Sequence, residues 1–102
     1  MSNSTRIPLT SDQLHSANTE LQAHMGLRLA KHGRLSFIGP HEAYGILAEE
    51  FGELLAAITS NNQNLAALEL LDIAVAAQFA LASMRAHQLQ RQYAQQSQGH
   101  QP

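Results

Sequence analysis

The chain has 102 residues, 44% of them hydrophobic and 5% aromatic, with a formal net charge of −2. This length supports one small domain, and the slight negative charge argues against a broad basic surface that binds nucleic acid. Cysteine is absent, which excludes disulfides and thiolate metal sites and fits a reducing cytoplasm.

Residues 1–10 are predicted to form a flexible, polar N-terminal arm, and we expect no signal peptide there because no apolar run is present. A helical domain is expected over residues 11–90. Its first helix begins at Ser11, a candidate N-cap, and ends before Gly33, a candidate C′ residue. The segment GRLSFIGP that follows is typical of a loop.

A second helix is predicted from about His41 to Thr59, and a third from about Leu65 to Gln88. A short polar turn, SNNQN, separates them, so the two helices should be antiparallel neighbours. Residues 91–102 are rich in Gln and are expected to be a disordered tail. The predicted fold class is therefore all-α, with three main helices in each chain.

The third helix is apolar on nearly every face between Leu65 and Met84. Its longest mostly apolar stretch is about a dozen residues, whereas a membrane span needs roughly 20, so we expect a buried helix and no membrane contact. Three helices of this size do not easily cover a helix that is apolar all round. We therefore expect the bundle to be completed by a homo-oligomer, either a dimer or a tetramer.

The second helix carries three of the eight acidic residues of the chain within the stretch AEEFGELLAA. At about 100° per residue, Glu50 falls inside the apolar stripe, Glu53 falls on its edge and Glu49 faces solvent. The third helix repeats the pattern with Glu69 and Asp72, one turn apart on an otherwise apolar segment. Two adjacent helices should thus each present a pair of carboxylates on the buried side.

Burying several carboxylates without compensation costs several kcal/mol per ion, which is a large share of a small domain's stability. No Lys or Arg lies between Arg34 and Arg85, so the two helices supply no basic partner near these acids. A divalent metal ion offsets the charge, and oxygen-only ligands favour Mg²⁺, with Mn²⁺ as a possible substitute. A solvated helix face is the alternative for either acidic pair taken alone.

The pattern EEFGE followed by ELLD resembles the all-α NTP pyrophosphatase superfamily, which includes MazG-like proteins. The loop and helix start KHGRLSFIGPHEAYGILAEEFGEL is similar to the lead-in of small MazG-like chains. This resemblance implies a helical bundle built by oligomerisation, whose acids hold Mg²⁺ and whose substrate is a nucleoside triphosphate. The implied reaction is hydrolysis of the α–β phosphoanhydride to a nucleoside monophosphate and pyrophosphate.

Carried over position by position, the resemblance assigns the metal to Glu50, Glu53, Glu69 and Asp72. Glu49 and Glu50 become the catalytic acids, with Glu49 in place to orient water or to act in the outer shell of the metal. His41 matches the family's lead-in to the second helix and is a candidate substrate-binding residue.

Basic residues cluster near the end of the first helix, where Arg28, Lys31 and Arg34 are candidates to meet phosphate at the mouth of the site. The alternative is that they are cations stabilised by the dipole at the helix C-terminus. The histidines at positions 15, 24 and 32 lack metal-binding spacing and are expected to be solvated.

The leading hypothesis is a cytoplasmic, Mg²⁺-dependent nucleoside triphosphate pyrophosphohydrolase. One alternative in the same class is an enzyme resembling phosphoribosyl-ATP pyrophosphatase, which ranks lower because the lead-in loop is MazG-like. An alternative of another class is a non-catalytic helical oligomer with a structural metal site.

Overall fold

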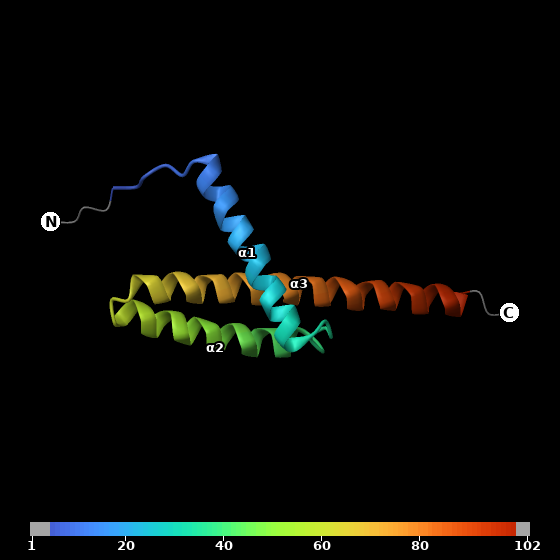
Figure 1. Cartoon of the computed structure of the whole chain (residues 1–102). Coiled ribbons are helices and arrows are strands. Elements are labelled where there is room, and N and C mark those ends of the chain that lie inside the picture. The colour runs from blue at the N-terminus through green and yellow to red at the C-terminus, as the bar shows by residue number, and fades with distance from the viewer. Residues whose placement is uncertain (1–4, 100–102) are drawn as a thin grey trace.

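A computed structural model of the chain describes residues 5–99, which form three helices: α1 (Ser11–His32), α2 (Pro40–Thr59) and α3 (Gln63–Gly99). The all-α prediction is confirmed, because the part of the chain from residue 5 to residue 99 contains no strand. Figure 1 shows α2 and α3 lying antiparallel, with α1 crossing them and its N-terminal half extending away from the pair. The molecule is elongated, measuring 73 × 30 × 29 Å.

The first helix begins at Ser11, but its N-cap is Thr10 and not Ser11 as predicted. The Thr10 hydroxyl accepts a hydrogen bond from the Gln13 backbone N–H at 3.1 Å, and the Thr10 N–H donates to Gln13 Oε1 at 2.9 Å. This reciprocal pair is a capping box. The helix ends as predicted at Gly33, whose φ of 79° lies in the region that favours glycine.

A tight turn makes α2 and α3 antiparallel, as the short polar segment between them predicts. Asn61 has a φ of 58°, a conformation that asparagine tolerates, and the N–H groups of Asn61 and Asn62 donate to the carbonyls of Ile58 and Ala57, both at 3.0 Å. The Asn62 side chain then caps α3 by accepting from the Leu65 N–H at 3.0 Å. Chain reversal over so few residues brings the two acidic segments onto facing helices.

The third helix continues beyond its predicted end near Gln88 and reaches Gly99. The expectation of a disordered tail from residue 91 is therefore not met over residues 91–99, and residues 100–102 lie outside the described residues. The physical reason is that Gln, Ala and Arg are good helix formers, so a polar helix can extend past the last packed turn. Of the predicted N-terminal arm, residues 5–10 have no regular secondary structure, and residues 1–4 are not described.

The core of the chain is small and lies where the loop before α2 meets α3. Phe37 packs edge-on against Phe79, with ring centroids 4.9 Å apart, and Ala43 and Ala80 complete the buried cluster. Met25 and Leu29 of α1 pack against it, although α1 itself buries no residue fully. The loop is held to α3 because the Phe37 N–H donates to the Ser83 hydroxyl at 3.0 Å.

Large apolar side chains remain exposed on all three helices, and among them are Leu27, Phe51, Leu55, Leu68 and Leu81. The third helix also has the length and composition to cross a membrane, with a mean hydropathy of 1.8 over its most apolar window, of which only 17% is buried. This differs from the sequence-based expectation, which counted only an apolar stretch of about a dozen residues within this helix. The same test is passed by core helices of soluble proteins, so on its own it is weak evidence.

Candidate functional site

Three carboxylates converge between α2 and α3. Glu50 of α2 and Glu69 and Asp72 of α3 each offer one oxygen, and these oxygens all lie within 4.8 Å of one another. All three residues are half-buried, which agrees with the predicted placement of Glu50 inside the apolar stripe and of the α3 acids on its buried side. The predicted pair of carboxylates on the buried side is therefore present on α3, whereas on α2 only Glu50 is half-buried.

The other two acids of α2 flank this cluster. Glu49 is exposed, as its angular position predicts. Glu53, predicted to lie on the edge of the apolar stripe and to bind the metal, is exposed as well, and neither residue belongs to the converging set. Glu53 nevertheless lies close enough to raise the pKa of both Glu50 and Glu69. Glu53 is thus an edge residue of the cluster, and Glu49 lies further towards solvent.

The cluster is electrostatically unfavourable without a cation. The pKa of Glu50 is raised above its ordinary value of 4.5, first by burial and then by the carboxylates of Glu53, Asp72, Glu69 and Glu49. The pKa of Glu69 is also raised, by burial first and then by Glu53 and Asp72. Burial and repulsion act in the same direction because both disfavour the ionised form.

The residues present fit a hard divalent ion. The Oε2 atoms of Glu50 and Glu69 are both shielded from solvent and have no hydrogen-bond partner among the described residues. One oxygen of each of the three carboxylates lies within 4.8 Å of the other two, so a single ion bound there would be held by all three side chains. The donor set is all carboxylate oxygen, which suits Mg²⁺ or Mn²⁺.

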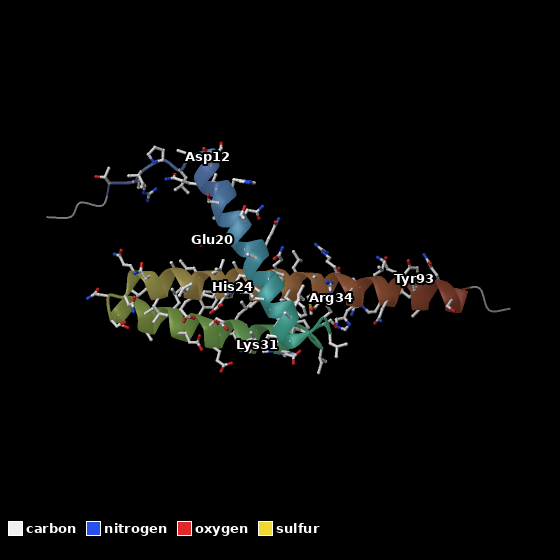
Figure 2. The ribbon with its side chains drawn as sticks, viewed as in Figure 1. Asp12, Glu20, His24, Lys31, Arg34 and Tyr93 are labelled. Atoms are coloured by element: carbon white, nitrogen blue, oxygen red, sulfur yellow. The ribbon has the colours of Figure 1, made fainter. Side chains whose placement is uncertain are left out.

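A cavity of about 560 Å³ opens beside the cluster where α1 crosses the other helices. Glu50 and Asp72 line it from α2 and α3, and aliphatic side chains of both helices form part of its wall. The remaining lining comes from one face of α1 and is mostly basic or titratable: His24, Leu27, Arg28, Lys31 and His32. Figure 2 shows His24 at the crossing and Lys31 further along the same helix.

The structure brings two of the four predicted substrate-binding residues to this cavity. Arg28 and Lys31 line it, whereas Arg34 is exposed in the loop after α1 and His41 is exposed in the first turn of α2, and neither contributes to the lining. In Figure 2, Arg34 lies past the end of α1, close to where the chain turns towards α2.

His24 is a site residue that the sequence does not single out. It is expected to be solvated, but its Nε2 lies within hydrogen-bond distance of Oδ1 of Asp72, at 2.5 Å. The two residues are 48 positions apart, so no local motif connects them. The one available signal is spacing, because His24, Arg28 and Lys31 recur at i, i+4 and i+7 and therefore share a face of α1.

Comparison of the chain with protein-family models, with curated proteins and with solved structures finds no match. The fold and the site therefore define the protein only as an all-α chain with a carboxylate cluster suited to a metal ion. Any more particular assignment depends on the chemistry of the residues around that cluster.

Proposed function

We propose that the chain is a Mg²⁺-dependent nucleoside triphosphate pyrophosphohydrolase that converts a (d)NTP and water into a (d)NMP and pyrophosphate. One observation supports this most: a single cavity is lined both by carboxylates that suit a divalent ion and by the cations Arg28 and Lys31, which pair with none of them. A metal-chelated polyphosphate carries the complementary charges. Its negative oxygens can face the cations while its metal faces the acids.

The residues divide the chemistry between them. Glu50, Glu69 and Asp72 would hold the ion, with Glu53 at the edge of the set and His24 fixing the orientation of Asp72. A divalent ion bound there would neutralise phosphate charge and acidify a water molecule. Glu49 lies on the solvent side of α2, the helix that carries Glu50, and it is the candidate to orient the attacking water.

We also propose that the chain works as a homo-oligomer in the cytoplasm. Exposed apolar side chains on every helix favour a second copy as their cover, because patches of this kind are seldom left in water. Insertion of α3 into a bilayer is less favourable, because it would carry Glu69 and Asp72 with it. Size-exclusion chromatography with light scattering should give a dimer or tetramer at micromolar concentration, and a clean monomer would contradict this assignment.

Calorimetry with Mg²⁺ or Mn²⁺, followed by measurement of pyrophosphate release from the common NTPs and dNTPs and from phosphoribosyl-ATP, tests the proposed activity. We expect saturable metal binding and metal-dependent release of pyrophosphate from at least one nucleotide. Metal binding without turnover on any nucleotide would instead favour the non-catalytic oligomer with a structural metal. Turnover confined to phosphoribosyl-ATP would favour the other pyrophosphatase assignment.

A further inference from the structure

The guanidinium of Arg28 lies on an aromatic surface and lacks a partner for one of its donors. Its carbon Cζ is 3.8 Å from the centroid of the Phe79 ring and 5.4 Å from that of Phe37. Its Nη1 atom is shielded from solvent and has no hydrogen-bond partner among the described residues. A shielded, charged donor with no acceptor is costly, so a ligand that supplies an acceptor to this guanidinium would stabilise it.

The aromatic surface beneath Arg28 is itself firmly held. Phe79 belongs to α3, and Phe37 belongs to the loop before α2, where both rings are buried against each other. The Phe37 backbone is fixed at both ends, because its N–H donates to Ser83 Oγ at 3.0 Å and its carbonyl accepts from His87 Nε2 at 2.7 Å. The stacking partner of Arg28 is thus in place before any ligand arrives.

A guanidinium stacked through its face keeps its N–H donors free along its edge. That edge suits phosphate oxygens, which accept two parallel hydrogen bonds from one guanidinium. Arg28 also shares its cavity with Lys31, a second cation, and with the metal-binding acids Glu50 and Asp72. A ligand that contacts all of them must carry several negative charges and chelate a divalent ion.

From this we infer that Arg28 is the fixed phosphate-binding residue of the site and takes the triphosphate group of the substrate, and that Phe79 is the residue that positions it. This deepens the proposed function, on which it rests for the identity of the substrate. Phe37 supports the Phe79 ring and contributes little directly, because its centroid is further from the guanidinium.

The test uses inorganic tripolyphosphate with Mg²⁺ as the probe, titrated into the full chain by calorimetry. Arg28→Gln should weaken tripolyphosphate binding about tenfold to 100-fold, the range of a lost charged hydrogen bond. Arg91→Gln, which removes an exposed Arg from α3 far along the chain from the cavity, is the matched control and should leave the affinity unchanged. Arg28→Lys should give an intermediate affinity, because it keeps the charge but not the planar fork.

The positioning role is tested by two matched aromatic changes. Phe79 is 7% exposed and Phe37 is 6% exposed, so Phe79→Leu and Phe37→Leu each remove a buried ring from the same pair. Phe79→Leu should weaken tripolyphosphate binding about threefold to tenfold through the lost cation–π contact, and Phe37→Leu less than about twofold. The Mn²⁺ affinity of both variants, measured without tripolyphosphate, should equal that of the wild type. A general loss of packing would lower the Mn²⁺ affinity as well.

The outcomes separate the two proposals. If Arg28→Gln binds tripolyphosphate as tightly as the wild type, the phosphate assignment of Arg28 is overturned. Equal losses in Phe79→Leu and Phe37→Leu would overturn the positioning role of Phe79. If tripolyphosphate binding depends on Arg28 but no nucleotide is hydrolysed, the inference stands and the proposed activity fails.

Discussion

Replacing Glu50 with Gln is expected to abolish pyrophosphate release while leaving the metal-free chain as stable as the wild type or more stable. Glu50 is half-buried in the carboxylate cluster, where its charge is opposed by four neighbouring acids. Removal of one electrostatic group from an active site typically costs about 100-fold or more in rate, and we expect at least this loss. Removal of an uncompensated buried charge does not destabilise the folded chain. Asp72→Asn should behave in the same way towards activity.

Glu20→Gln is the matched control for this pair of variants. It also removes one carboxylate, but Glu20 is exposed on α1 and lines a different cavity, between α1 and α3, which contains none of the three clustered carboxylates. Its turnover should be that of the wild type. If Glu50→Gln or Asp72→Asn retained most of the wild-type turnover, the assignment of these residues to the metal would be wrong.

Lowering the pH should reduce the stability difference between Glu50→Gln and the wild type in the absence of metal. The pKa of Glu50 is raised above 4.5 in the folded chain. Between the ordinary pKa and the raised pKa, the folded state therefore binds more protons than the unfolded state. Protonation therefore favours folding, and the penalty of the ionised carboxylate is fully present above the raised pKa. Urea unfolding at several pH values between about 4.5 and 7 should show the variant's advantage disappear towards the acid end.

With a divalent ion bound, the wild type should become more stable than Glu50→Gln at neutral pH. Mn²⁺ at about 100 times its Kd would stabilise the folded wild type by about 2.7 kcal/mol, and acid should weaken the effect because protons compete for the same carboxylates. Glu50→Gln should gain much less from Mn²⁺, whereas Glu20→Gln should gain as much as the wild type. Equal stabilisation of all three chains by Mn²⁺ would place the ion somewhere other than the carboxylate cluster.

Local rules predicted much of the fold, because they depend on residues close together in the sequence. The φ of Gly33, the turn through Asn61 and the angular position of Glu50 each follow from a few neighbouring residues. The sequence predicts an end of α3 that is too early, because the segment after Gln88 is rich in Gln and lacks apolar periodicity, whereas the helix continues to Gly99. A polar helix leaves no periodic signal of that kind.

The part of the site that the sequence predicts is the α2–α3 carboxylate cluster, together with Arg28 and Lys31 of α1 as cations near it. The convergence of Glu50, Glu69 and Asp72 follows from helical spacing and a short turn, and both are visible in the sequence. The contribution of α1 depends on how that helix crosses α3, which no local pattern specifies. For this reason the contact of His24 with Asp72 and the stacking of Arg28 on Phe79 could not be anticipated.

A crystal of the chain grown with Mn²⁺ tests the central claim most directly, through anomalous scattering from the ion. We predict a peak between α2 and α3, about 2 Å from oxygens of Glu50, Glu69 and Asp72. Those carboxylates turned into solvent, with no anomalous peak among them, would contradict the account.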